Sequence, residues 1–583
     1  MKAIRYTGLV LFLFSLGLFL SSFFMSTFTL TENTFSSIVK SEHQDILKPA
    51  LTDVFGKEYS LSIPFVNSIN AAVKQVNEKA RAEQKWDEVI YDDYAGSLAR
   101  ASAGGFVPEN KLLVFFLIYI VGAIGAMMFI LPQIKLQGPA GIKNNHIFHN
   151  ALNNRGWMGM LTGALLVGFY IFLYFFPAYI TNWIIIVDPL QKLINPSASS
   201  SQWFLYGFLY TFAVLVMGVR MIIKYRHSKY QIFRTCSVMF FQLAVAFLIP
   251  EILVKLNQPY FDFKNMWPLD YDFFDAWHIN TLTQSGGLGI FMFVWGITLF
   301  VVGVPVFVYF FGKRWYCSWV CGCGGLAETA GDPFRQLSDK STEAWQIERF
   351  IIHGVLVFGI IMTGLVLYNF FGGDFYISFS KWTVMGTVIL LGAGLYLYHR
   401  KKFPSMSGKK VRNTAISISG FFALGVIFSE FSVFAKYMPV DGSNFSFSSG
   451  NIRTVYGFMI GSIFSGVVGT GFYPLMGNRV WCRFGCPLAA YLGLVQRFKS
   501  KFRITTNGGQ CISCGNCSTY CEMGIDVRAY AQKGQNIVRS SCVGCGICSA
   551  VCPRGVLNLE NREEDGRINQ PILLGNDSIS VTK

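Results

Sequence analysis

Long apolar runs separated by short polar segments make up most of the chain. Ten of these runs approach the ~20 residues that a helix needs to cross the hydrocarbon core of a bilayer. Because backbone groups in lipid must hydrogen-bond within their own segment, each run is expected to be a helix. The ten predicted spans are residues 8–30, 112–133, 157–178, 203–223, 236–255, 288–311, 350–370, 382–399, 414–434 and 454–475.

Lysine and arginine gather on alternate sides of these spans. They precede the first span, which we expect to be an uncleaved anchor, and follow the second, fourth, sixth, eighth and tenth. Basic loops of this kind face the cytoplasm, so both termini are expected there. The formal charge of +16 reflects this bias and does not point to a nucleic-acid partner.

The cysteines share one predicted side of the membrane. Thirteen of the fourteen lie beyond the cytoplasmic ends of spans six and ten or in the C-terminal tail, and Cys236 begins span five on the same side. The cytoplasm keeps thiols reduced, which argues against a disulfide framework. Metal ligation is therefore the leading interpretation.

The C-terminal region contains two cysteine runs, CISCGNCSTYC and CVGCGICSAVCP. Each has the C-x2-C-x2-C-x3-C spacing of bacterial two-cluster ferredoxins, in which the fourth cysteine of a run binds the other cluster. Zinc sites usually pair C-x2-C with a second, distant pair, so zinc is the weaker alternative. The predicted ligands are Cys511, Cys514, Cys517 and Cys552 for one [4Fe–4S] cluster, and Cys542, Cys545, Cys548 and Cys521 for the other.

Composition agrees with this division into membrane and ferredoxin parts. Of 583 residues, 52% are hydrophobic and 14% are charged, against roughly a quarter charged in soluble proteins. We predict an all-α polytopic membrane protein with about ten transmembrane helices and a small C-terminal α+β domain of the bacterial 2[4Fe–4S] ferredoxin type. The predicted divisions are an anchor (1–30), an extracytoplasmic segment (31–111), helices (112–311), a cysteine loop (312–349), helices (350–475), a second cysteine segment (476–505), the ferredoxin domain (506–560) and a tail (561–583).

Two further cysteine pairs form an internal repeat about 165 residues apart. GKRWYCSWVC begins at Gly312 and GNRVWCRFGC at Gly477, and each follows a span that runs inward. If each C-x3-C pair lies on a helix, its two thiols share one face. Two facing pairs would supply four thiolates. The predicted metal ligands are Cys317, Cys321, Cys482 and Cys486, with Cys323 as a fifth thiol that could replace Cys321.

Several interpretations of these pairs remain open. They could bind one shared iron–sulfur cluster, hold separate metals such as Cu(I), which also prefers thiolates, act as a redox dithiol, or be buried free cysteines at helix ends. Arg314 and Arg479 are candidates to offset the negative charge of a thiolate-bound site.

Paired C-x3-C motifs beside the membrane and a C-terminal two-cluster ferredoxin resemble the NosR, NapH and FixG/CcoG group of bacterial membrane proteins. The resemblance covers about residues 288–560. CRFGCPL, from Cys482, fits the C-x3-C-P motif, whereas the first copy has Gly322 in place of proline. The resemblance to this group implies a bacterial inner-membrane location. It also implies electron transfer from quinol or a cytoplasmic donor to an extracytoplasmic partner, which could be a flavoprotein or reductase. No flavin is predicted in this chain, because segment 31–111 has no flavinylation motif.

Weaker candidates are ionisable groups at predicted membrane depth and an aromatic outer loop. Charged groups in a membrane are functional hypotheses by default. Segment 68–93 is expected to be an amphipathic packing or docking helix. No b-type haem, nucleotide-hydrolysis or NADH site is predicted. The candidates are His353, Glu430, Glu251, the loop 256–287 with His278, and His146 and His149 in a cytoplasmic loop.

Three functions fit the sequence. The first is membrane-bound electron transfer, in which the chain is a component of an oxidoreductase system and its own enzymatic activity is left open. An inner-face cluster would still lie ~30 Å of hydrocarbon from an outside acceptor. The second, which the resemblance to FixG/CcoG implies, is a copper-reducing accessory factor for cytochrome oxidase assembly. The third is a redox sensor or scaffold.

Overall fold

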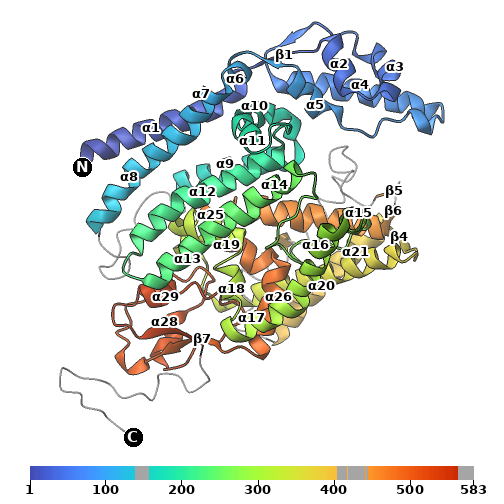
Figure 1. The fold of residues 1–583 in the computed structure, drawn as a ribbon. Coiled ribbons are helices and arrows are strands. Elements are labelled where there is room, and N and C mark those ends of the chain that lie inside the picture. The colour runs from blue at the N-terminus through green and yellow to red at the C-terminus, as the bar shows by residue number, and fades with distance from the viewer. Residues whose placement is uncertain (138–155, 403–415, 418–419, 421–439, 442–443, 562–583) are drawn as a thin grey trace. The chain divides into compact units, whose positions relative to one another are not determined.

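The computed structural model describes residues 1–137, 156–402, 416–417, 420, 440–441 and 444–561, and it is mostly helical (Figure 1). Seven helices in the described ranges are long and apolar enough to cross a membrane, which indicates a multi-pass membrane protein. They correspond to the first seven predicted spans. These helices are Lys2–Phe24, Lys111–Leu136, Trp157–Phe175, Gln202–Lys224, Lys229–Lys255, Gly286–Phe311 and Thr342–Phe370.

The other three predicted spans are not confirmed. For span 382–399, helix α21 (Lys381–Lys402) covers the predicted range and includes the apolar stretch Lys381–Gly394. Most of span 414–434 lies outside the described residues. For span 454–475, the helical stretch of α24 (Ser449–Tyr456) and η12 (Gly457–Val468) stops before Gly469, in a glycine-rich sequence that disfavours helix.

The chain forms two compact units. The first comprises Met1–Gln137, Gly168–Lys224 and Phe247–Asn257. Its elements include α1 (Lys2–Ser21), η1 (Ser22–Phe24), η4 (Phe116–Ile120), α7 (Lys111–Phe115), α8 (Val121–Gln137), η7 (Pro177–Ile180), α10 (Thr181–Ile186), α11 (Asp188–Ile194) and α12 (Gln202–Lys224).

Within this unit, α1 and α8 run side by side (Figure 1). Their close approach depends on glycine, because a Cβ at Gly8 would lie 2.7 Å from the Gly125 oxygen. The Ser15 hydroxyl of α1 also donates to the Leu117 carbonyl of η4, which precedes α8. The first predicted span ends earlier than expected, since Thr27–Thr29 forms strand β1 and β-branched threonine favours strands.

The predicted segment 31–111, together with strand β1, folds around an apolar cluster. Its three-stranded sheet has the order β2–β1–β3, and the core includes Phe28, Phe65 and Leu98. The expected helix over 68–93 is α4 (Ser62–Ala82), which ends early because Gln84 is left-handed, with φ 57°. The elements are α2 (Glu32–Ile38), α3 (Ser41–Leu47), β2 (Glu58–Tyr59), α5 (Tyr94–Ala101), β3 (Ala103–Gly104) and α6 (Phe106–Glu109).

The second unit comprises Gly138–Val167, Tyr225–Ala246 and Gln258–Lys583, and it contains all fourteen cysteines. A continuous core joins its membrane helices to the C-terminal module. A small sheet of order β4–β6–β5 lies beside α24. The elements are α13 (Lys229–Phe240), α15 (Ala276–Gln284), α16 (Gly286–Thr298), η9 (Leu299–Gly303), α17 (Val304–Phe311), α18 (Arg314–Cys317), α19 (Gly322–Thr329), η10 (Asp332–Leu337), α20 (Thr342–Phe370), β4 (Tyr376–Ser380), β5 (Val440–Asp441), β6 (Asn444–Ser448), α25 (Tyr473–Met476), η13 (Trp481–Gly485) and α26 (Pro487–Phe498).

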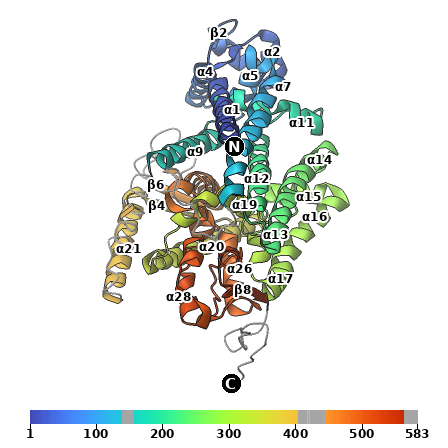
Figure 2. The same cartoon turned by 90° about the vertical axis from the view of Figure 1, so that its left-hand side faces the viewer.

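The C-terminal module is small and of mixed α+β type, as predicted. Strands β7 (Phe502–Thr506) and β8 (Leu557–Asn561) pair antiparallel, with Phe502 opposite Asn561. Figure 2 shows the module beside α26, and the Gln496 amide of α26 donates to the Arg539 carbonyl. The intervening helices are α27 (Asn516–Thr519), α28 (Val527–Gln532) and α29 (Ile547–Ala550).

Candidate metal centres

The eight cysteines of the C-terminal runs surround two cavities. Each cavity takes three cysteines from one run and the fourth from the other, which is the crossed arrangement that the spacing predicts. Their volumes are about 350 and 380 Å³. The smaller, which we call the distal cavity, is lined by Cys511, Cys514, Cys517 and Cys552. The larger, the proximal cavity, is lined by Cys521, Cys542, Cys545 and Cys548.

The two runs use the same backbone device to wrap these cavities. Gly515 and Gly546 occupy equivalent places, are left-handed with φ near 79° and 74°, and begin the short helices α27 and α29. Ser513 and Gly544 are the second equivalent pair, with φ 59° and 63°. Glycine adopts this conformation without steric cost. Each short helix therefore turns the chain so that the third thiol faces the cavity begun by the first two.

The two C-x3-C pairs enclose a third cavity, the juxtamembrane cavity, of about 260 Å³. This cavity brings together two segments that lie about 165 residues apart in the chain, as the repeat predicts. Its sulfur-bearing lining residues are Cys317, Cys321, Cys323, Cys482 and Cys486.

The expectation that each pair shares one helix face is wrong. Cys317 ends α18, and Cys321 is the N-cap of the next helix, α19. In the second copy Cys482 lies in η13, and Cys486 is the N-cap of α26. A turn between the two cysteines, rather than one helical turn, therefore directs both thiols into the cavity.

The two copies of the repeat share backbone conformation as well as sequence. Gly312 and Gly477 both have positive φ, 66° and 95°, at the point where the chain turns toward the cysteines. At the second cysteine, the Ala489 amide donates to the Cys486 sulfur over 3.3 Å. An N-terminal amide aimed at sulfur stabilises thiolate, the form that binds metal.

Two buried polar atoms at the juxtamembrane cavity have no hydrogen-bond partner among the described residues. They are the Tyr316 hydroxyl and the Trp481 indole nitrogen, and both residues line the cavity. A buried donor without a partner is costly. Bound sulfide or thiolate would accept hydrogen bonds from them, so the donor set fits a metal–sulfur group in this space.

The Gly324→Ala variant is expected to disrupt the juxtamembrane cavity. A Cβ at Gly324 would lie 2.1 Å from the Cys317 carbonyl oxygen, so α18 and α19 must move apart. Overpacking of this kind typically costs about 1–3 kcal/mol. Metal content and thermal unfolding measure the effect. Gly354→Ala in α20 is the control, since nothing lies within 4 Å of its added Cβ, and equal behaviour of the two variants would contradict the close contact.

Positive charge reaches the juxtamembrane cavity from Arg479 and Lys313. The Arg479 guanidinium lies 3.5 Å from the Cys482 sulfur, as the sequence predicts. Arg314 does not act in this way, because it lies over the Phe502 ring at 4.8 Å and donates to Asn561. Burial raises the pKa of the Cys317 thiol to about 12, and the cation that most opposes this rise is its neighbour Lys313.

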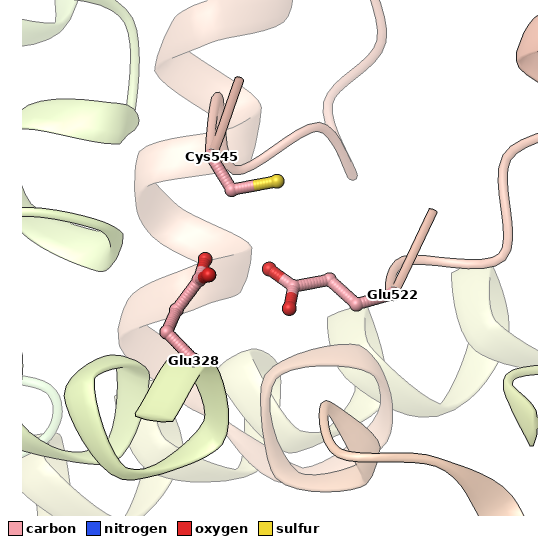
Figure 3. Close-up of side chains that lie close together, drawn as sticks. All are labelled: Glu328, Glu522 and Cys545. Carbon is pink, nitrogen blue, oxygen red and sulfur yellow. The ribbon is translucent and has the colours of Figure 1, made fainter. Parts of the chain in front are cut away.

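Glu328 and Glu522 face each other beside Cys545 of the proximal cavity (Figure 3). One ligand atom from each of the three lies within 4.8 Å of the other two. Such a group could hold a metal by distance alone. Glu522 stands where the first cysteine run would carry proline, and no role is predicted for it from the sequence.

Arginine side chains already neutralise these two carboxylates. Although burial opposes ionisation, three guanidinium groups hold the pKa of Glu328 well below its usual range. We therefore assign the cluster as a buried charge network and not as a separate metal site. The distances to Glu328 are 2.6 Å from Arg234, 2.8 Å from Arg335 and 2.7 Å from Arg479, and Glu522 lies 2.9 Å from both Arg335 and Arg479.

A short bonded path connects the juxtamembrane and proximal cavities. The Ser318 hydroxyl donates to the Val543 carbonyl over 2.8 Å, and both atoms are buried. Ser318 follows Cys317 in the chain, and Val543 follows Cys542. The two cavities are therefore separated by two residues and one hydrogen bond.

The ionisable residues that were weaker candidates make ordinary hydrogen bonds or packing contacts where the structure describes them. The His353 ring bonds to the Arg349 carbonyl one turn away at 2.6 Å, and Glu251 accepts from Gln191. His278 is buried against Phe273. Glu430, His146 and His149 lie outside the described residues.

Comparison with known proteins identifies the class of chemistry. Residues 510–557 match the family model described as a 4Fe-4S dicluster domain, and residues 292–341 and 456–505 both match the one described as a 4Fe-4S binding domain. The chain is therefore an iron–sulfur protein with ferredoxin-type domains.

One relative points to the use of these clusters. Over 50 residues the chain is 40% identical to the "Putative electron transport protein YccM" of Escherichia coli (strain K12), and the match covers 9% of the chain and 14% of that protein. No solved structure matches the chain. The domains and this relative support an electron-transfer role, while membership of the NosR, NapH or FixG/CcoG group stays a prediction.

Proposed function

We propose that the chain is a membrane-bound electron-transfer protein with three centres, in the order distal, proximal and juxtamembrane. Clusters bound in these cavities would supply one-electron redox chemistry. The protein supplies the order, because cysteines cross between the distal and proximal cavities and the Ser318–Val543 hydrogen bond joins the proximal and juxtamembrane ones.

The observation that carries this proposal is the juxtamembrane cavity. It gathers five cysteines from both copies of the repeat and two unpartnered donors. An iron–sulfur cluster held by cysteine thiolates uses four of these ligands, and its sulfides would accept hydrogen bonds from both donors. Both copies of the repeat also match a 4Fe-4S binding model.

The proposal extends to topology and partners. We place both termini and all three centres on the cytoplasmic side of a bacterial inner membrane, following the basic loops. The acceptor would be a redox partner protein, such as an extracytoplasmic flavoprotein or reductase, and quinol is the alternative donor to a cytoplasmic one.

Anaerobic metal analysis tests the number and kind of centres. We expect about twelve irons per chain and no copper, which corresponds to three four-iron clusters. About eight irons with one copper per chain would replace the proposal by the copper-handling function. A full iron complement whose loss changes partner assembly but leaves electron flux intact would favour a sensor or scaffold.

A further inference from the structure

Of the three cysteine-lined cavities, the distal one brings sulfur to the surface of the protein. Cys514 is exposed, and Cys511 and Cys552 are half-buried. None of the cysteines that line the proximal and juxtamembrane cavities is exposed. Electron transfer between two proteins slows steeply as the distance between their centres grows. A soluble electron carrier would therefore exchange electrons with this chain at the distal cavity.

The C-terminal module is attached to the rest of its unit beside the proximal cavity. The Tyr230 hydroxyl of α13 donates to the Gly544 carbonyl over 3.0 Å, and the Gln231 amide donates to the Cys545 carbonyl over 2.9 Å. Gly544 and Cys545 both line the proximal cavity. Among the described residues, no hydrogen bond connects a lining residue of the distal cavity to an element outside the module. The attachment to the membrane helices thus leaves the distal cavity accessible.

The surface around the distal cavity is basic and partly apolar. Arg528 of α28 and Arg554, in the turn before β8, line this cavity, and its lining contains no aspartate or glutamate. Both arginines are exposed, and neither forms an ion pair with another described residue. Ile512 is 56% exposed. We call this surface the distal rim, and it consists of Ile512, Cys514, Arg528, Pro553 and Arg554.

Hydrogen bonds fix α28 against the first cysteine run. The Gln532 amide donates to the Ser513 hydroxyl over 2.6 Å, and the Arg528 backbone amide donates to the Ser518 hydroxyl over 2.8 Å. Ser513 precedes the exposed Cys514 in the chain and lines the same cavity. The helix therefore keeps the positive charge of Arg528 beside the exposed thiol.

This combination of charge and apolar surface fits a protein partner. Protein interfaces are enriched in arginine and combine apolar contacts with a polar edge. Transient redox complexes bury less than about 1,200 Å² in total, so a small patch is sufficient. Exposed charges are screened by salt and do little to stabilise a cluster, but a positive patch attracts an acidic partner and raises the rate of association. The distal rim therefore favours a negatively charged carrier.

We propose that the distal rim is the docking surface for an acidic one-electron carrier protein of the cytoplasm and that electrons enter the chain there. This inference rests on the proposed function, and it names the class of the donor. In the transfer step, the reduced carrier loses one electron, which passes to the distal centre and reduces it. No covalent bond forms or breaks, and no proton is required.

Flavodoxin, an acidic FMN protein that carries single electrons, is the probe for this surface. The full chain is purified anaerobically in phosphatidylcholine nanodiscs, and its affinity for flavodoxin is measured at low salt with both proteins oxidised, so that no electron moves. Arg528→Gln combined with Arg554→Gln should weaken this binding about tenfold. Added salt should weaken binding by the wild type more than binding by the double variant. The distal EPR signal should persist, because all four cysteines remain.

A kinetic measurement and a matched control complete the test. The rate constant for reduction of the chain by reduced flavodoxin should also fall about tenfold in the double variant. Arg497→Gln removes an exposed arginine of α26 that lines none of the three cavities, and it should change neither the affinity nor the rate. Equal affinity of the double variant and the wild type overturns the inference and leaves the proposed function standing. A wild type without a third EPR signal overturns the proposed function, while the flavodoxin affinity still reports on the distal rim.

Two other occupants of the distal rim give different results. If the arginines bind anionic lipid, the double variant and the wild type bind flavodoxin equally, and phosphatidylglycerol in the nanodiscs alters the distal EPR signal of the wild type alone. If the acidic residues Glu563, Glu564 and Asp565 of the chain's own tail occupy the rim, flavodoxin binds only when the chain is shortened to end at Asn561. Either result overturns the inference.

Discussion

The Cys482→Ser protein is expected to lose one of the three proposed electron-accepting centres and to keep the other two. Cys482 lines the juxtamembrane cavity, where it lies 3.5 Å from Arg479, and it lines neither ferredoxin-type cavity. A serine hydroxyl is a poor substitute for thiolate as an iron–sulfur ligand. Iron should fall from about twelve to about eight per chain. In EPR during stepwise reduction, one signal should disappear while the two ferredoxin-type signals persist.

Two companion variants sharpen this result. Cys236 is exposed on α13 and lines none of the three cavities, so Cys236→Ser should retain every signal. Cys323→Ser should also keep the third centre, because Cys321 holds the N-cap place that Cys486 holds in the second copy. If Cys482→Ser retains all its iron and all its signals, the shared centre is wrong.

Local spacing was enough to predict the cysteine groupings. The four-cysteine runs lead to the crossed sets that line two cavities, and the repeat of C-x3-C leads to the third. Ligand geometry of this kind depends on a few neighbouring residues. The helix-face argument failed because it assumed one helix for each pair, whereas Cys321 and Cys486 are the N-caps of new helices.

What the sequence did not reveal depends on contacts between distant segments. No role was predicted for Glu522, but it forms ion pairs with Arg335 and Arg479 from two other parts of the chain. The only hint of this role in the sequence was the glutamate itself, which replaces the proline expected after the first cysteine run. The loop 256–287 was predicted only as an aromatic outer loop. Its residue Trp267 donates to Thr363 of α20 and lies 5.3 Å from the Phe300 ring of η9, contacts between distant segments that no local pattern predicts.

The Glu328→Gln protein is expected to lose more stability than any surface variant. The Glu328 side chain is 3% exposed and forms ion pairs with three arginines, Arg234, Arg335 and Arg479. Glutamine keeps the size but removes the charge, so buried guanidinium groups lose a counter-ion. Breaking a buried ion pair from one side typically costs about 3–5 kcal/mol. Denaturant unfolding of the detergent-solubilised protein measures this loss, and the iron should be released at lower temperature because Glu328 lies beside Cys545.

Restoring the balance of charge is the decisive comparison. A double variant, Glu328→Met with Arg234→Met, removes one charge of each sign and should recover part of the lost stability, since apolar replacement of a whole buried pair is often neutral. Glu78→Gln breaks only an exposed i,i+4 pair with Lys74 and should change little. If Glu328→Gln has the same free energy of unfolding as the wild type, the ion pairs of Glu328 do not stabilise the protein. A double variant less stable than the single would show that Arg234 stabilises the protein by packing rather than by its charge.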